Sequence, residues 1–523
     1  MKAFIEKYQS AIKGAISGFD RVLFRGTLRR ISSVHGLSTY LSYTGILLKD
    51  FKTWANDTTQ RIRRESEAVA QVAGRPVCYL NSSGIDKEDY ARGIAQRDGI
   101  KDGLVCLLTA VEPCMSFDIH KNREKKKLEL VARERKCLWI YHYMIHPLLG
   151  FMHARIQTWA PFTIKICING REWLSRQMDN ARLGYVRRAN CFTDLKNIAV
   201  SQQLMDTQIQ TDWPKLLNSI QKTISPAHDR LFAHYPLPYY WSADESEWAT
   251  DIMFKSQSQL ANLYPRLINH GIRDFGSTDV MRFLGQANRA SSGIHSNFKG
   301  QIVTDIKNRP EGMRIKHRIN RNHIKMYDKE GSVLRVETTI NNTREFKVYR
   351  RANDDPKQKF SWQKMRKGVA DLHRRAKVSQ ASNNRYLQAL SSVDLQATVE
   401  EQLQPLCRKV VWNNKNFRAI NPWSTHDRAL LAAINRGEFS INGFRNRDIL
   451  GLVYHQEHDL NQLDRKRTSA RVSRNIRLLR AHGLIHKVTK SNRYVLSEKG
   501  RTIRASLSTV NASKISDLYN KAA

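Results

Sequence analysis

Two acidic side chains follow a predicted buried strand and are candidate metal ligands. The apolar run at 103–111 predicts the strand, and Glu112 and Asp118 come after its end. Metal-dependent nucleases place carboxylates at such a strand edge, where a bound divalent cation polarises the scissile phosphate. Ordinary surface carboxylates are also common there, so both interpretations stay open for this pair.

Polar and apolar residues alternate at 153–159, and this period of two predicts a strand. His153, Arg155 and Gln157 would share one face of it, close to Trp159. Such a face suits the stacking of a flipped or single-stranded base. A half-buried antiparallel strand explains the same pattern and is the interpretation that we favour.

The segment 18–26 sets Asp20, Arg21 and Arg25 within an apolar stretch. A nucleotide or phosphate site is one interpretation of this mixture. A buried strand with exposed charges is the one that we favour.

Residues 313–340 predict three strands joined by polar or glycine turns, at 313–319, 323–327 and 332–340. The second strand carries Ile-Lys-Met-Tyr-Asp-Lys and the third carries Leu-Arg-Val-Glu. Together they resemble the "YDK … LRxE" strands of single-tyrosine rolling-circle replication initiators. In that superfamily a sheet carries metal-binding acidic residues, and a tyrosine on a later helix attacks a DNA phosphodiester.

The resemblance implies a set of site residues. Tyr327, Asp328 and Lys329 match the first motif, and Arg335 and Glu337 match the second. Glu337, with Asp328 as a further candidate, would bind a divalent cation, Mg²⁺ or Mn²⁺, at the scissile phosphate. Tyr327 and Lys329 would belong to the catalytic site, although a lysine–glutamate pair on neighbouring strands also forms ordinary salt bridges. The compact His-hydrophobic-His metal motif of many such enzymes is missing.

A basic helix predicted at 362–390 offers the tyrosine that this chemistry needs. Tyr386 lies on it, 49 residues after Glu337, and is the first choice for a nucleophile that forms a phosphotyrosine link. Tyr327 is the second choice. Arg374 and Arg375 lie earlier on the same helix and would neutralise phosphates.

Residues 424–510 predict three helices followed by a β-hairpin formed by 484–488 and 493–496. This is the element order of a winged helix-turn-helix. The segment LRAHGLIHKVTKSNRYVLSEKGR resembles the wing region of MarR-like winged-helix regulators. The resemblance implies that the third helix enters a DNA major groove while the wing lies over a phosphate or the minor groove.

Basic side chains crowd the third helix and the wing. Arginine suits both bidentate guanine contacts and phosphate contacts. The alternative is a solvated cationic helix in a domain used only for protein contacts. The candidate DNA-binding residues are Arg465, Arg467, Arg471, Arg474 and Arg477 on the helix and Lys487, Lys490 and Arg493 on the wing.

The composition points to a polyanionic partner. Among 523 residues, Lys and Arg number 87 against 48 Asp and Glu, which gives a net charge of +39. DNA, duplex or single-stranded, is the expected partner, and RNA is the alternative. The sequence has no GxxxxGK[ST], GxGxxG, GxSxG or HExxH motif, which argues against an ATPase, a Rossmann oxidoreductase or an α/β-hydrolase.

No membrane segment or signal peptide is predicted, and the seven cysteines form no CxxC pair, so we expect a cytoplasmic protein.

The expected fold class is α/β (α+β) with several domains. A mixed-sheet domain at 1–200 precedes a helical, aromatic-rich region at 201–290 and a β-meander with a basic helix at 300–403; the winged helix ends the chain. This predicts a DNA-binding protein of a mobile element or replicon, of transposase or replication-initiator type, with metal-dependent strand cleavage or transfer in the 300–403 region. The alternatives are a non-enzymatic winged-helix transcriptional regulator and a structured-RNA-binding ribonucleoprotein component.

Overall fold

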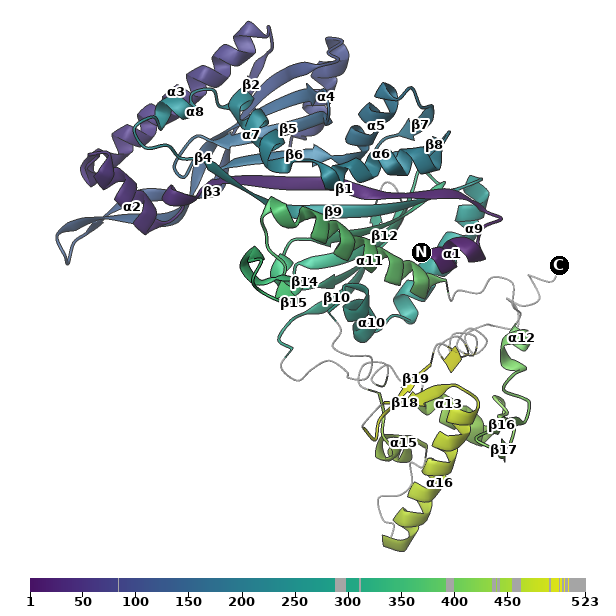
Figure 1. Cartoon of the computed structure of the whole chain (residues 1–523). Coiled ribbons are helices and arrows are strands. Elements are labelled where there is room, and N and C mark those ends of the chain that lie inside the picture. Colours follow the sequence, from purple (N-terminus) through teal and green to yellow (C-terminus); the bar gives the residue numbers. More distant parts are fainter. Residues whose placement is uncertain are drawn as a thin grey trace. The chain divides into compact units, whose positions relative to one another are not determined.

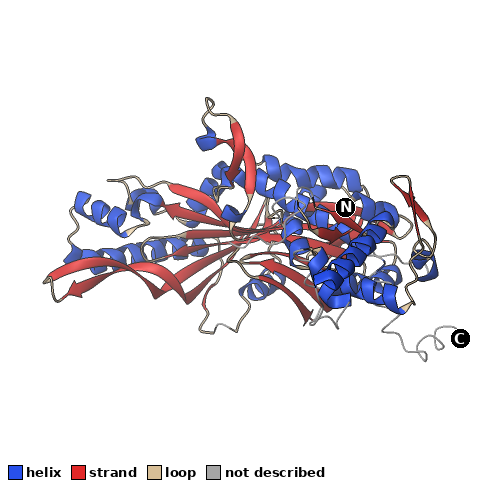
Figure 2. Cartoon of the chain, turned by 90° about the horizontal axis from the view of Figure 1, so that it is seen from below, coloured by secondary structure: helices blue, strands red, loops and turns tan. Residues whose placement is uncertain are grey.

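The computed structural model describes most of the chain: residues 1–82, 84–286, 298–309, 312–391, 399–434, 439, 443–453, 462–488, 491–497, 499–500, 503 and 507. The chain forms two compact units, each assembled from separate stretches of sequence. Unit 1 contains residues 1–13, 254–336 and 381–523, and unit 2 contains residues 14–253 and 337–380. Both combine helices and strands (Figure 2), so the expected mixture of α and β structure is confirmed.

Unit 2 is built on a large mixed sheet. The strands are β1 (Ile12–Leu28), β2 (Val77–Tyr79), β3 (Gly103–Asn122), β4 (Lys127–His146), β5 (Gly150–Gln157), β6 (Ile164–Asn169), β9 (Tyr239–Phe254) and β13 (Val333–Ile340). Their order is β13-β9-β1-β6-β5-β4-β3-β2. Figure 1 labels the strands from β9 to β2. The pairs from β1 through β6, β5 and β4 to β3 are antiparallel, and β2 joins the edge in parallel.

Helices cover this sheet because its strands carry apolar side chains at alternate positions. Val22, Phe24 and Leu28 of β1 are fully buried in the core of unit 2. The covering helices include α2 (Val34–Tyr43), α3 (Phe51–Val72), α4 (Lys87–Arg97), α5 (Gly170–Asn180), α6 (Ile198–Gln210), α7 (Trp213–Ile224) and the short α8 (His228–Leu231). The hairpins β7–β8 (Tyr185–Arg188, Cys191–Leu195) and β14–β15 (Lys347–Arg351, Phe360–Lys364) complete the unit.

Unit 1 contains the expected meander. Strands β10 (Ile302–Arg309), β11 (Gly312–Ile319) and β12 (Asn322–Lys329) pair antiparallel, and the first half of β13 follows. Helices α9 (Gln257–Arg273) and α10 (Ser277–Phe283) pack against β11. The remaining elements before residue 424 are α1 (Lys2–Lys7), α12 (Val399–Leu403) and the hairpin β16–β17 (Val410–Trp412, Lys415–Phe417).

Two segments differ in local structure from the expectation. The region 201–290 is mostly helical, with helices α6 to α10, but the segment that begins at Tyr239 forms the long strand β9. The predicted helix at 362–390 begins later, as α11 (Leu372–Leu390), because Trp362 lies on β15, where it pairs with Tyr349. Aromatic and β-branched residues prefer strands. The prediction gave more weight to the helical pattern of the neighbouring residues than to this preference, and so it missed both strands.

The C-terminal part of unit 1 has its own hydrophobic core. It contains α13 (Thr425–Ile434), α15 (Asn446–Val453), α16 (Gln462–Ala481) and the hairpin β18–β19 (Ile485–Lys487, Tyr494–Leu496). Leu430, Ile449 and Val472 are fully buried in this core. An additional antiparallel bridge joins Phe444 to Tyr494 on β19. Among the described residues, no helix is long and apolar enough to cross a membrane.

Candidate metal centre

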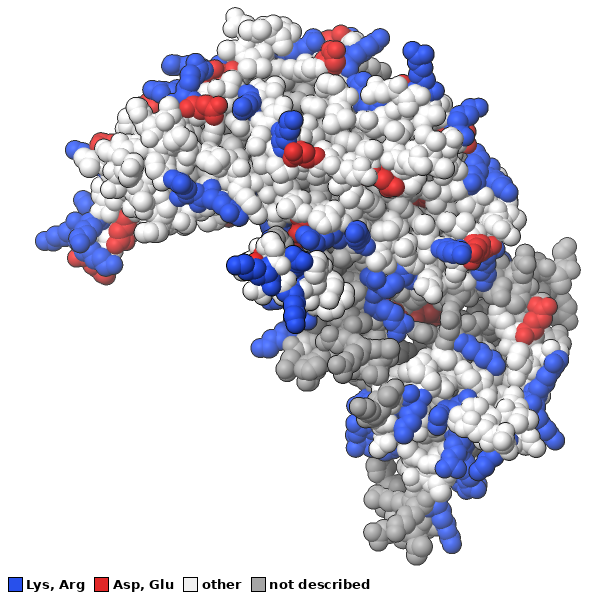
Figure 3. All heavy atoms as spheres, viewed as in Figure 1, with Lys and Arg blue, Asp and Glu red and all other residues white. Residues whose placement is uncertain are grey.

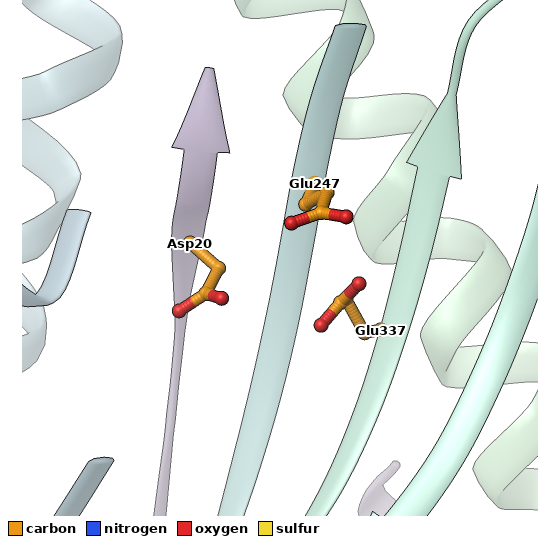
Figure 4. Close-up of side chains that lie close together, drawn as sticks. All are labelled: Asp20, Glu247 and Glu337. Carbon is orange, nitrogen blue, oxygen red and sulfur yellow. The ribbon is translucent and has the colours of Figure 1, made fainter. Parts of the chain in front are cut away.

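Three carboxylates meet on three neighbouring strands of unit 2. Asp20 comes from β1, Glu247 from β9 and Glu337 from β13, and Figure 4 shows their carboxylates turned toward one another. One oxygen of each lies within 4.8 Å of the others. Oxygen ligands on opposite sides of one Mg²⁺ ion are about 4.2 Å apart, given Mg–O distances of about 2.1 Å. The cluster could therefore hold a divalent cation.

The cluster is closed on most sides. Asp20 and Glu337 are 5% and 1% exposed, whereas the Glu247 side chain keeps 13% of its surface. Like charges at this separation repel by roughly 3 kcal/mol per pair at an effective dielectric constant of about 20. A cation bound between the three oxygens would remove this repulsion, and Glu247 lies at the accessible side.

Strand alternation explains why Glu247 faces the cluster. Its neighbours Ser246 and Trp248 contact α11: Arg375 donates to the Ser246 hydroxyl at 3.2 Å, and the Trp248 indole donates to Gln380 at 2.8 Å. Successive side chains on a strand point to opposite faces of the sheet. Glu247 therefore points to the face opposite α11, where Asp20 lies.

Neighbouring polar groups fix the position of Asp20. The Asn190 amide donates to both carboxylate oxygens, at 3.0 and 3.2 Å. The guanidinium of Arg171 lies 3.7 Å from Asp20 and forms a fully buried ion pair with Asp251 at 2.7 Å. Outer groups of this kind orient the ligands of metal sites.

The start of α5 carries Arg171 to this place. Asn169 caps the helix by accepting hydrogen bonds from the backbone N–H groups of Arg171 and Glu172. Gly170 allows close contact with β1, because a Cβ atom there would lie 1.6 Å from the carbonyl oxygen of Phe19. A larger residue at position 170 would push α5, and with it Arg171, away from Asp20.

Arg21 lies at the rim of the cluster. Its guanidinium pairs with Glu245 and, at 3.2 Å, with Glu247, while half of its side-chain surface stays exposed. Burial acts to lower the pKa of Arg21, but the nearby carboxylates, Glu247 foremost, raise it above the usual value. Arg21 is thus a permanent positive charge beside the cluster.

Sequence reasoning found one of the three carboxylates and missed two. Glu337 was expected as a metal ligand, and the structure brings it together with Asp20 and Glu247. Asp20 had been considered as part of a nucleotide or phosphate site or, in the favoured interpretation, as an exposed charge on a buried strand, whereas it is 5% exposed. The common signal is an acidic residue inside a strand-like apolar run, as in Phe-Asp-Arg-Val-Leu-Phe and Leu-Arg-Val-Glu-Thr-Thr.

The structure does not support the expectation that Glu112 and Asp118 bind a metal ion at the end of a strand. Both lie within β3 and not beyond the end of a strand. Glu112 accepts from Arg155 at 2.7 Å and from the Tyr141 hydroxyl at 2.5 Å. Burial alone would raise the pKa of Glu112, but Tyr141 and Arg155 lower it below the usual value.

Asp118 is likewise neutralised by protein cations. It pairs with Arg133 and lies 3.4 Å from Arg135. Neither Asp118 nor Glu112 belongs to a cluster of three possible ligands among the described residues. Both form ion pairs with arginines, and the clustered carboxylates are other residues.

Tyr386 is placed where a nucleophile cannot work. It is fully buried, and its hydroxyl hydrogen-bonds to Nε2 of His317 at 3.1 Å. The rings of Phe275 and Phe283 contact it edge-on. Burial raises the pKa of the hydroxyl well above its usual value, which disfavours the nucleophilic phenolate. Tyr386 is a core residue of unit 1.

The YDK segment forms the end of β12 in unit 1. Tyr327, Asp328 and Lys329 are all half-buried, and the Lys329 ammonium lies 5.9 Å from the Tyr327 ring centre. Burial raises the pKa of Asp328 to about 6. Asp328 is not one of the three clustered carboxylates.

Arg374 and Arg375 of α11 were expected to neutralise phosphates, and the structure supports this only for a partly exposed Arg374. Arg375 is 1% exposed and donates to the carbonyl oxygen of Ala243 at 2.7 Å, and burial lowers its pKa to about 10. Arg374 pairs with Asp371 at 2.5 Å. Arg375 therefore stabilises the packing of α11 and is not available to phosphates, while Arg374 remains partly exposed.

Residues 153–157 form the antiparallel strand that we favoured, and Trp159 lies just beyond its end. They belong to β5, which pairs with β4 and β6. Burial lowers the pKa of His153 to about 3, and the Trp159 indole donates to the carbonyl oxygen of Phe117 at 2.8 Å. These contacts give the strand a structural role.

The arginines of the C-terminal helix lie on its outer side. Arg467, Arg471, Arg474 and Arg477 are exposed on α16, while Val472, Ile476 and Leu479 between them are buried. Figure 3 shows Lys and Arg side chains gathered over this part of the chain. On the wing, Lys487 is exposed and Arg493 is half-buried; Arg465 lies on α16, and Lys490 lies outside the described residues.

Comparison of the chain with protein-family models, with curated proteins and with solved structures gives no match. The function proposed next therefore depends on the geometry and charge of these residues.

Proposed function

We propose that this protein is a metal-dependent enzyme that cleaves or transfers DNA strands, with Mg²⁺ or Mn²⁺ bound by Asp20, Glu247 and Glu337. The observation that carries the proposal is the meeting of these three carboxylates within 4.8 Å. The net charge of +39 favours a polyanionic substrate.

The chemistry is phosphoryl transfer without a protein nucleophile. A bound divalent ion would lower the pKa of a coordinated water and polarise the phosphate. The oxygen of water, or of a DNA hydroxyl, attacks phosphorus, and the P–O bond to the leaving strand breaks. Arg21, half exposed beside Glu247, is placed to contact a phosphate oxygen.

Recognition of DNA is assigned to residues 424–510. The order of α13, α15, α16 and the hairpin β18–β19 is that of a winged helix-turn-helix, and the Phe444–Tyr494 bridge adds the third short strand. The exposed arginines of α16 suit a major groove, and Lys487 suits a phosphate. We therefore propose duplex DNA as the ligand of this part of the chain.

Strand cleavage is tested with supercoiled plasmid and end-labelled oligonucleotides, in Mg²⁺, in Mn²⁺ and in EDTA. The wild-type protein should nick only with metal. Glu337→Gln and Glu247→Gln should reduce nicking by about 10- to 100-fold or more, because loss of even an outer group that orients a metal ligand has an effect of this size. Glu112→Gln is the matched control, because this carboxylate pairs with Arg155 instead. Metal-independent nicking, or full activity of Glu337→Gln, would overturn the proposal.

A further inference from the structure

The β14–β15 hairpin of unit 2, labelled in Figure 1, carries three exposed aromatic side chains. Tyr349, Phe360 and Trp362 are 58%, 52% and 67% exposed. Large aromatic side chains are normally buried because their transfer from water is favourable. Three of them exposed on one short hairpin require an explanation.

These rings form one continuous platform. Tyr349 and Trp362 are direct cross-strand partners, and their ring centres lie 5.7 Å apart. Phe360 stacks on Tyr349 from the neighbouring position, also at 5.7 Å and with an interplanar angle of 29°. The inner face of the hairpin is separate: Val348 and Arg350 are each 6% exposed.

Positive charge frames the platform. Lys347 and Lys364 are exposed and lie directly opposite each other on the two strands, and the Arg351 guanidinium covers the Phe360 ring at 5.0 Å. Like charges in direct cross-strand positions destabilise a sheet. Neither strand carries an acidic residue. A bound anion would offset the repulsion between the two lysines.

The base of the hairpin is tied to strand β9. The backbone N–H of Ala243 donates to the carbonyl oxygen of Lys367, and the Lys367 ammonium pairs with Asp244 at 2.6 Å. Asp244 and Glu247 lie three residues apart on β9, which corresponds to roughly 10 Å along the strand. The hairpin is thus anchored on the strand that supplies Glu247.

We propose that the outer face of β14–β15 binds single-stranded nucleic acid. Bases stack on Tyr349, Trp362 and Phe360, and the phosphates contact the flanking lysines. Every base has a π-face, so stacking tolerates any sequence, and basic residues beside the rings follow the backbone. This deepens the proposed function and rests on it for the class of substrate, because the platform would hold a DNA strand on the same unit as the three carboxylates.

Binding is measured by fluorescence anisotropy of labelled oligo-dT and oligo-rU with the full-length protein in EDTA. Tyr349→Ala and Trp362→Ala should each raise the Kd by about 5- to 150-fold, the range for the loss of one stacked base. Trp362→Phe should keep most of the affinity, since a ring remains. Lys347→Gln plus Lys364→Gln should weaken binding and reduce its salt dependence. The two oligonucleotides distinguish DNA from RNA as the preferred strand.

The matched control is Tyr43→Ala, which removes a tyrosine that is 75% exposed on α2 of the same unit. It should leave the Kd unchanged. Unchanged binding by Tyr349→Ala and Trp362→Ala would overturn the proposal, as would equal losses for single-stranded and duplex DNA. Sedimentation gives a further test. If the wild type is a dimer, and the aromatic variants are monomers that bind oligonucleotides as the wild type does, the proposal is also overturned.

The two proposals fail separately. Glu337→Gln should bind oligo-dT as the wild type does, because the measurement contains no metal. Tight binding through the aromatic residues by a protein that never cleaves would overturn the enzymatic function alone. Metal-dependent cleavage by a protein whose aromatic variants bind normally would overturn the platform alone.

Discussion

Asp20 and Glu337 meet across strand β9. The strand order β13-β9-β1 puts one strand between them, so their backbones lie two strand spacings, or about 9.6 Å, apart. Their carboxylate oxygens nevertheless lie within 4.8 Å, because both side chains converge on Glu247. Residues 317 positions apart in the sequence therefore form one candidate metal centre.

Tyr386→Phe should leave metal-dependent cleavage intact and should not change the amount of any denaturant-stable protein–DNA adduct. The hydroxyl is buried against His317, so its loss removes one hydrogen bond and costs about 1 kcal/mol of stability. Urea unfolding measures the stability, and denaturing gels measure the adduct. An adduct in the wild type that disappears in this variant would restore Tyr386 as the nucleophile.

Arg171→Gln should destabilise the protein by about 3–5 kcal/mol, because a buried carboxylate loses its ion-pair partner. Both side chains of the Arg171–Asp251 pair are 0% exposed. Chemical unfolding followed by tryptophan fluorescence gives the change. Arg63→Gln is the control, since its pair with Glu67 is exposed and should have little effect. Equal effects of the two substitutions would contradict this account of the buried pair.

Asp328→Asn should stabilise unit 1 at pH 8 relative to wild type and make little difference at pH 4. Burial raises the pKa of Asp328 to about 6, above its ordinary value of 3.8. The folded state therefore holds a proton more tightly than the unfolded state, so the stability supplied by this group is lost as the pH rises through this window. Thermal unfolding of the wild type and of Asp328→Asn between pH 4 and pH 8 tests this prediction. A difference in stability between the two proteins that does not change with pH would contradict the raised pKa of Asp328.

Arg471→Ala plus Arg474→Ala should weaken site-specific duplex binding by about 1–3 kcal/mol for each base-reading arginine. Both side chains are exposed on α16. A selected DNA site and a scrambled duplex, compared at one salt concentration, give the specificity. Deletion of residues 424–523 should abolish site selection and leave salt-sensitive binding. Full specificity of the truncated protein would contradict the assignment.

Local patterns predicted local structure well. The strand segments between polar or glycine turns at 313–340 predicted β11, β12 and β13, and the resemblance of the third strand drew attention to Glu337. The patterns did not reveal which distant strands pair, and that pairing decides which carboxylates meet. Glu247 was missed because β9 lies within a region that otherwise has a helical pattern. Tyr386 was misassigned because a helical position alone does not say whether a side chain is buried.

Direct measurement of Mn²⁺ binding by electron paramagnetic resonance tests the central claim. Wild-type protein should bind Mn²⁺ in competition with Mg²⁺, and Asp20→Asn, Glu247→Gln and Glu337→Gln should each weaken that binding by about 10- to 100-fold or more. Glu112→Gln should bind as the wild type does, because its carboxylate already pairs with Arg155. Equal Mn²⁺ binding by the wild type and by correctly folded Glu337→Gln would contradict the claim that these three carboxylates form a metal centre.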